Sequence, residues 1–173
     1  PKTNLAGILT GMGSLSYGEL AGERMKLGLM LHDPEEEHDC FADNTHWSHY
    51  NDAMSVWNVY TGGYTDIHGR RMTGPSVSDL VAAEDPSIDA ELRSKLHQTI
   101  GRMNRIVESA KTGVAYDQLI GEDNTEGNAM VKAAIDALVD QTRSIEKAVN
   151  VLGLEAIAFE GSDSLDAPQK VFN

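Results

Sequence analysis

Residues 127–152 read GNAMVKAAIDALVDQTRSIEKAVNVL and carry the clearest helical pattern in the chain. Apolar residues and one threonine recur there four and three residues apart, at Val131, Ile135, Leu138, Thr142, Ile145, Val149 and Leu152. Such alternation is typical of a helix that packs against a partner along its whole length. Gly153 follows directly, as glycine commonly does after the last turn of a helix. The stretch therefore predicts a long helix in the core.

A partner with the same pattern precedes it in the chain. Asp85-Pro86-Ser87 indicates a helix start, with proline near the first turn, and Gly113 indicates its end after about Lys111. Between them the repeating positions are Leu92, Leu96, Thr99, Met103, Ile106 and Ala110. We expect these two helices to pack on each other.

Residues 3–31 also show a helical pattern, although the segment contains six glycines. Four of them, Gly7, Gly11, Gly18 and Gly22, fall within about 60° of one another at the 3.6-residue repeat. Two interpretations are open. The glycine face lets another helix approach closely, or the glycines break the helix, since each costs about 1 kcal/mol relative to alanine.

A further long helix is expected from about residue 43 to Tyr60. Asp43 or Asn44 can cap its start, and Gly62-Gly63 marks its end. Its apolar face is expected at Tyr50, Ala53, Met54 and Trp57.

The region between this helix and the core pair is expected to hold short elements. Residues 64–75 are typical of an exposed loop or small hairpin, and residues 76–83 of a short helical turn. Together the patterns predict an all-α fold, an up-down bundle of four main helices that forms a single domain over residues 1–173.

The amino-acid composition limits the kinds of molecule that the protein is expected to bind. The 173 residues include 14 Lys and Arg against 27 Asp and Glu, a formal net charge of −13. This charge disfavours nucleic acid and anionic membrane surfaces and favours cations, including metal ions. No apolar run approaches the roughly 20 residues of a membrane-spanning helix. The chain opens with Pro1, so we expect it to be processed or truncated, and any membrane anchor to lie in a missing N-terminal segment.

Candidate metal ligands concentrate in His32–Asp52, HDPEEEHDCFADNTHWSHYND, which holds four of the six histidines and the only cysteine. Imidazole and carboxylate groups are the donors that iron, zinc and manganese use. The His32-x-x-Glu35 spacing contains a proline, which favours a loop. His46-x-x-His49 is better placed, on the expected helix, although such pairs also occur on ordinary helix surfaces.

A second candidate group lies on the first helix, where Glu19 and Glu23 are expected to be one turn apart, next to Arg24. They share the side that carries several apolar residues. If that side faces the core, the carboxylates need Arg, His or a metal as partner, because unpaired buried charges are costly. If it is turned outward, they are simply solvated.

Other chemistries find no support. The chain contains neither the Gly-x-Ser-x-Gly motif of serine hydrolases nor the His-Glu-x-x-His motif of zinc proteases. Cys40, being alone, cannot form an internal disulfide, so it is either a free thiol or the partner of a cysteine elsewhere.

Four segments resemble the imelysin family, which comprises bacterial cell-envelope proteins that are often iron-regulated and often classed as peptidases. They are GMGSLSYGELAGERM (residues 11–25), HDPEEEHDCFADNTH (32–46), NVYTGGY (58–64) and GPSVSDLV (74–81). The chain is similar to the C-terminal half of such a protein. The resemblance implies one half of a duplicated two-bundle fold, with a functional site where the halves meet. It also implies a location in the periplasm or cell envelope, in association with the outer membrane.

The family's Gly-x-His-x-x-Glu motif belongs to the N-terminal half and is missing from this chain, so that half is the expected partner. The resemblance carries over six candidate residues for a metal or functional site: Glu19, Glu23, Arg24, Asp43, Asn44 and His46. His32, His38 and His49 are weaker candidates. The expected cofactor is a metal ion, iron or zinc.

The expected function is iron binding or uptake, with the site at the interface between the halves. Two alternatives stay open. One is a metallopeptidase of the imelysin type, in which Glu19 or Glu23 acts as general base toward a metal-bound water. The other is a non-catalytic scaffold, in which the polar residues only stabilise the bundle.

Overall fold

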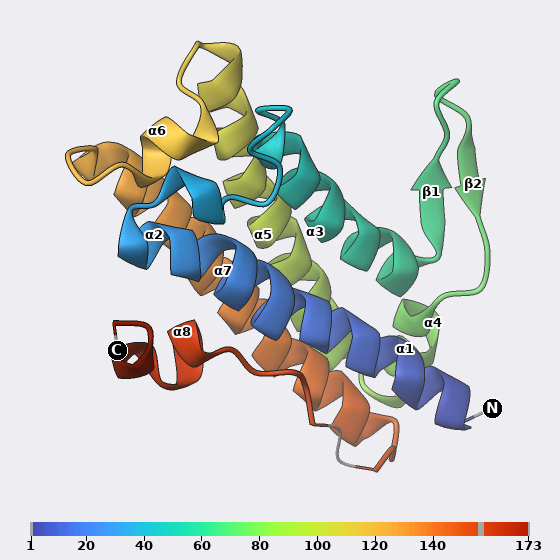
Figure 1. The fold of residues 1–173 in the computed structure, drawn as a ribbon. Helices are drawn as coiled ribbons and strands as arrows, with labels where there is room; N and C mark the ends of the chain where they lie inside the picture. Colours follow the sequence, from blue (N-terminus) through green and yellow to red (C-terminus); the bar gives the residue numbers. More distant parts are fainter. Residues whose placement is uncertain (1, 156–157, 173) are drawn as a thin grey trace.

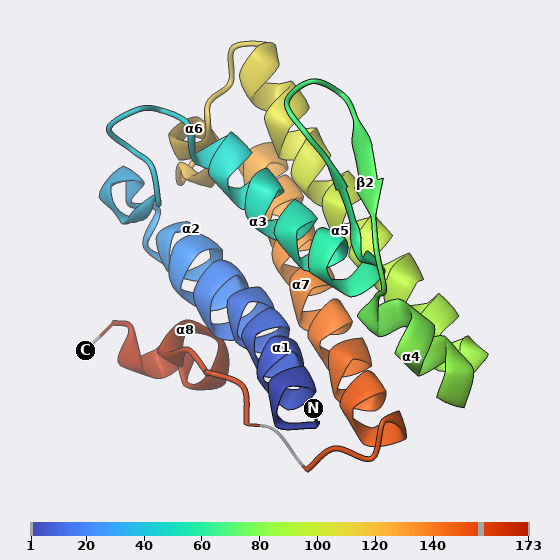
Figure 2. The same cartoon turned by 90° about the vertical axis from the view of Figure 1, so that its right-hand side faces the viewer.

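Four long helical runs follow one another up and down through the molecule (Figures 1 and 2). The computed structural model describes residues 2–155 and 158–172, so Pro1 lies outside the described residues. The first run consists of α1 (Lys2–Ser14), the π-helix η1 (Leu15–Lys26) and α2 (Leu27–Leu31), and the others are α3 (Thr45–Thr61), α5 (Pro86–Lys111) and α7 (Thr125–Val151). The predicted all-α bundle of four main helices is confirmed.

Shorter elements connect and extend these runs. They are the 3₁₀ turn η2 (Pro34–Glu36), strands β1 (Gly63–Thr65) and β2 (Arg71–Thr73), helices α4 (Val77–Glu84), α6 (Tyr116–Ile120) and α8 (Asp163–Asp166), and the 3₁₀ turn η3 (Pro168–Lys170). The strands pair antiparallel with Gly63 opposite Thr73, and their hairpin projects from the bundle (Figure 1). The sequence predicted the hairpin region but neither α6 nor α8.

Helices α5 and α7 form the centre of the core, as their matching patterns predicted. The α5 positions Leu92, Leu96, Met103 and Ile106 and the α7 positions Val131, Ile135, Leu138 and Ile145 are all buried. The predicted helix ends are also confirmed. The Asp85 side chain accepts hydrogen bonds from the backbone N–H groups of Ser87 and Ile88, and Gly113 and Gly153 adopt positive φ after the last turns.

The first run differs from the expected uninterrupted α-helix. Residues 15–26 form a π-helix, whose backbone bonds join residues five apart, and such stretches are rare and frequently occur at functional sites. Five residues correspond to about 140° around an α-helix but return to the same side of a π-helix. Glu19 therefore faces Arg24, which donates to it, whereas Glu23 accepts a hydrogen bond from Ser162.

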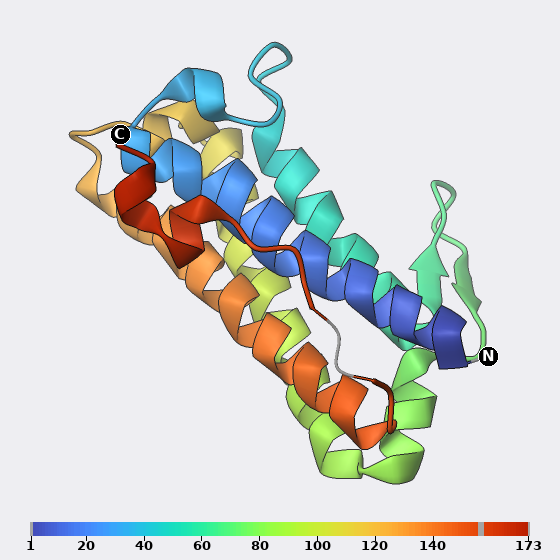
Figure 3. The same ribbon diagram turned by 60° about the horizontal axis from the view of Figure 1, so that its bottom comes forward.

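Half of the glycine face packs closely, and its partner is the C-terminal end of the chain and not one of the long helices. Residues 158–172, which we call the C-terminal segment, run beside the first helical run (Figure 3). A Cβ on Gly18 would lie 2.5 Å from the Glu160 carbonyl oxygen, and one on Gly22 would lie 2.3 Å from the Ser162 Cβ. At Gly7 and Gly11 an added Cβ would meet nothing within 4 Å. Close packing is thus confirmed for only half of the predicted face.

Helix α3 is rotated relative to the predicted apolar face. Its buried residues are Thr45, His49, Ala53, Val56 and Tyr60, whereas Tyr50, Met54 and Trp57 are only partly buried. One of the predicted metal-ligating histidines therefore lies in the core. Among the described helices, none combines the length and the apolar character needed to cross a membrane.

Candidate functional site

Arg24 on η1 connects three segments of the chain at one end of α3. Its Nε donates to Glu19 Oε2 at 3.2 Å, and its Nη1 donates to Asp52 Oδ2 at 2.8 Å. The same Nη1 lies 3.4 Å from His38 Nε2 in the loop before α3. Arginine can only donate, so in this contact Arg24 is the donor and His38 Nε2 the acceptor. We call Glu19, Arg24, His38, His49 and Asp52 the Arg24 cluster.

His49 is the most unusual member of the Arg24 cluster, because it is fully buried and neither ring nitrogen has a hydrogen-bond partner among the described residues. Its ring stacks on the exposed His38 ring at a centroid distance of 6.3 Å and meets Tyr116 edge-on at 5.0 Å. Burial, with the neighbouring His38, Arg24 and His46, lowers the pKa of His49 to about 3. The imidazole is therefore neutral at physiological pH, the form that binds metals.

Further polar atoms around His49 are also buried and unpartnered within the described residues. They are His46 Nδ1, Glu37 Oε2 and the Tyr116 hydroxyl. Burial raises the pKa of the Glu37 carboxyl, and nearby aspartates act in the same direction. Most buried polar groups in proteins are hydrogen-bonded, so a local concentration of exceptions points to a bound ion, ligand or water.

The sequence around Asp43 and Asn44 folds the preceding loop back onto α3. Asp43 adopts a φ of 49°, and Asn44 follows at the N-cap position of the helix. The Asn44 side chain makes no capping bond, although its carbonyl oxygen accepts from Trp47 and Ser48. Asn44 and Asp43 thus shape the loop that carries His38, and within the described residues neither side chain is hydrogen-bonded to the Arg24 cluster.

Two other predicted residues lie away from the Arg24 cluster. Glu23 accepts a 2.6 Å hydrogen bond from Ser162 Oγ and so holds the C-terminal segment. His32 ends α2 with a φ of 52°, and its Nδ1 donates to the Ile120 carbonyl oxygen at 2.7 Å, which ties α2 to α6.

The structure therefore brings Glu19, Arg24, His38 and His49 together, with His46 beside them, and separates Glu23 and His32. Sequence reasoning missed three neighbours. Glu37 and Asp52 lie in the ligand-rich stretch His32–Asp52 without having been singled out, and Asp52 also follows His49 by three residues on the same helix, whereas Tyr116 gave no signal.

The donors present do not amount to a metal site by themselves. The described part of the chain contains no group of three or more His, Cys, Asp or Glu side chains that could hold a metal ion. Two of the carboxylates near His49, those of Glu19 and Asp52, are already engaged by Arg24. Cys40 is exposed and has a free thiol. The Arg24 cluster can supply imidazole donors, but a complete coordination sphere needs groups from outside the described chain.

Comparison with known proteins gives one family. No curated protein matches the chain at the significance required. The family model for Imelysin, Peptidase_M75, matches residues 1–145, which include α1 through most of α7 and every member of the Arg24 cluster. The chain belongs to the imelysin family.

Proposed function

We propose that this chain is one part of an iron-regulated cell-envelope protein and that the Arg24 cluster forms one wall of an iron-binding site. The observation that carries the proposal is the buried, neutral His49 with two unpartnered ring nitrogens. Ferrous iron and zinc both accept imidazole nitrogen, together with carboxylate oxygen. The net charge of −13 attracts cations to the molecule.

The remaining ligands are proposed to come from the N-terminal half of the protein. The described residues contain no group of three side chains that could hold a metal ion. A complete iron site would therefore need further ligands on a second surface that faces the Arg24 cluster. The Gly-x-His-x-x-Glu motif expected in that half supplies one imidazole and one carboxylate on a single helical face. Such a set would complement the imidazoles of the Arg24 cluster.

His38 supports a route to the buried ring. It is exposed, and its imidazole stacks on His49, so it is the first imidazole of the pair that an incoming group meets. Arg24 Nη1 lies 3.4 Å from His38 Nε2 and occupies the lone pair of that nitrogen. The His38 ring would therefore have to give up this hydrogen bond before its Nε2 could ligate a metal.

A second candidate function is that of a scaffold. Arg24 links η1, the loop before α3 and α3 itself through Glu19, His38 and Asp52. A network of this kind can stabilise the packing of these segments without any ligand. In that case His49 would be tolerated as a neutral core residue.

Anaerobic calorimetric titration of ferrous iron, with zinc as comparison, distinguishes these functions. The samples are this chain alone, this chain joined to its N-terminal half, and joined forms that carry His49→Leu or His68→Leu. We expect binding in the joined form, loss of binding in H49L, and unchanged binding in H68L, because His68 lies exposed in the hairpin. Absence of binding in the joined form would refute the iron proposal and leave the scaffold. Equal binding by H49L would place the iron site elsewhere.

A further inference from the structure

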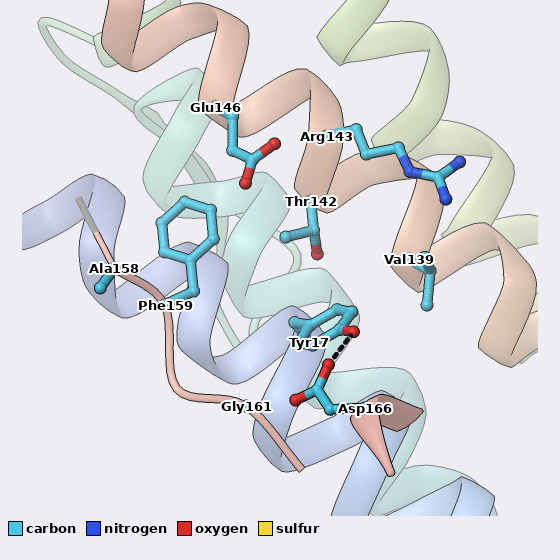
Figure 4. A pocket seen from close by; sticks show the side chains of 9 residues that line it. All are labelled: Tyr17, Val139, Thr142, Arg143, Glu146, Ala158, Phe159, Gly161 and Asp166. Atoms are coloured by element: carbon cyan, nitrogen blue, oxygen red, sulfur yellow. Dashed lines mark hydrogen bonds between the residues drawn. The ribbon is translucent and has the colours of Figure 1, made fainter. Parts of the chain in front are cut away.

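A cavity of about 450 Å³ lies between η1, α7 and the C-terminal segment (Figure 4). This size falls within the range of roughly 300–1,000 Å³ found for small-molecule sites. The side chains that matter for its chemistry are Tyr17 from η1, Thr142, Arg143 and Glu146 from α7, and Phe159 and Asp166 from the C-terminal segment. None of them belongs to the Arg24 cluster.

The walls of this cavity are fixed by specific contacts. The Tyr17 hydroxyl donates a 2.6 Å hydrogen bond to Asp166 Oδ1, and the backbone N–H of Ser162 donates to Asp166 Oδ2 at 3.0 Å. The Phe159 ring lies against Gly13, where an added Cβ would approach a ring carbon to 2.3 Å. Only glycine leaves room for the ring at that position, so the aromatic wall depends on a particular residue of α1.

The charged groups that line the cavity are mainly acidic. The hydrogen bond to Asp166 is the main cause that raises the pKa of Tyr17 to about 12, so the phenol stays neutral. The Glu146 carboxylate makes no hydrogen bond or ion pair within the described residues, and it extends toward Phe159 (Figure 4). Arg143 extends away from Phe159 in the same view, and its Nη1 pairs with Asp140 at 3.3 Å.

We propose that this cavity binds a small organic ammonium ion with an apolar body. The ammonium group would donate to the free Glu146 carboxylate, and the body would lie along the rings of Phe159 and Tyr17. Aromatic faces attract cations, and a charge-assisted hydrogen bond to a carboxylate is stronger than a neutral one. An organic anion would instead meet Glu146 and Asp166 within a molecule of net charge −13.

Three probes that share a phenyl ring and differ in charge test the proposal: 2-phenylethylamine, 2-phenylethanol and phenylacetate. Binding is followed by chemical-shift changes in ¹⁵N-labelled protein and by calorimetry. We expect saturable binding of the amine with shifts at Tyr17 and Phe159. The alcohol should bind at least about tenfold more weakly, because it lacks the charge-assisted bond, and phenylacetate should not bind.

Glu146→Gln is the decisive variant, and Glu126→Gln is its matched control on the same helix. Both residues are exposed and both changes remove one negative charge, so the general attraction for cations falls equally. The amine should bind E146Q about tenfold more weakly and E126Q as it binds the original chain. Equal affinities in the two variants, equal binding of all three probes, or no saturation with the amine at millimolar concentrations would each overturn the proposal.

Discussion

Replacing His49 with leucine should remove an acid-sensitive element from the core. His49 is fully buried on α3, and burial lowers its pKa to about 3. In the unfolded chain the same imidazole titrates near 6.5. Between these two pH values the unfolded state binds a proton that the folded state does not, so stability is lost as the pH falls from about 6.5 toward 3.

The size of the effect follows from the two pKa values. A drop from 6.5 to about 3 corresponds to about 5 kcal/mol at acid pH, and the loss is about 1.4 kcal/mol per pH unit within this range. Small domains are stable by only about 5–15 kcal/mol, so one histidine accounts for a large share. Leucine has no titrating group, and it replaces two unpartnered nitrogens with an apolar side chain of similar size. H49L should therefore be as stable as the original chain at pH 7, or more stable by about 1 kcal/mol.

Urea unfolding at pH 7, 6, 5 and 4 measures this difference directly. The stability of H49L relative to the original chain should increase with each step below pH 6, whereas H68L should follow the original chain throughout. The reasoning fails if H49L and the original chain lose stability in parallel over this range. That result would mean that His49 is protonated or exchanges with solvent in the folded state.

The remaining predictions concern the glycine face, the buried carboxyl and the core. Gly18→Ala should destabilise the protein by about 1–3 kcal/mol and make the C-terminal segment protease-sensitive, because its Cβ would lie 2.5 Å from the Glu160 carbonyl oxygen. Gly11→Ala should instead raise the free energy of unfolding by about 1 kcal/mol, because nothing lies within 4 Å of the added Cβ. Thermal or urea unfolding measures this change. Burial raises the pKa of Glu37, so the folded protein loses stability as the pH rises above 4.5 and the buried carboxyl ionises. Glu37→Gln should therefore raise the melting temperature at pH 7–8. Leu138→Ala should cost about 2–5 kcal/mol in urea unfolding, because this α7 side chain is 1% exposed.

The long helices could be predicted because their signals are local. The four-and-three spacing of apolar residues on α5 and α7 is complete within each segment, and Asp85, Gly113 and Gly153 mark their ends. Each of these features depends on residues within one or two turns. No information from distant parts of the chain is needed to recognise them.

The packing of the first helical run could not be predicted in the same way, because it depends on residues far along the chain. Ser14 Oγ accepts from the Glu160 backbone N–H, 146 residues away, and Glu23 accepts from Ser162. The C-terminal segment shows no periodic pattern that marks it as a packing element. The π conformation of η1 likewise departs from the 3.6-residue repeat expected for residues 3–31, and it brings Glu19 to Arg24.

The sequence suggested that His46 and His49 form a pair on the helix surface, whereas the structure buries His49 in the core. Thr45, His49, Ala53, Val56 and Tyr60 are spaced four, four, three and four residues apart, so the burial pattern was present in the sequence. This burial pattern was hard to recognise because its first two members, Thr45 and His49, are polar. An imidazole at a packing position lies between α3 and the rest of the core, unlike one on an exposed face. Any ligand that engages His49 must therefore also change how α3 packs, which links binding to the stability of the bundle.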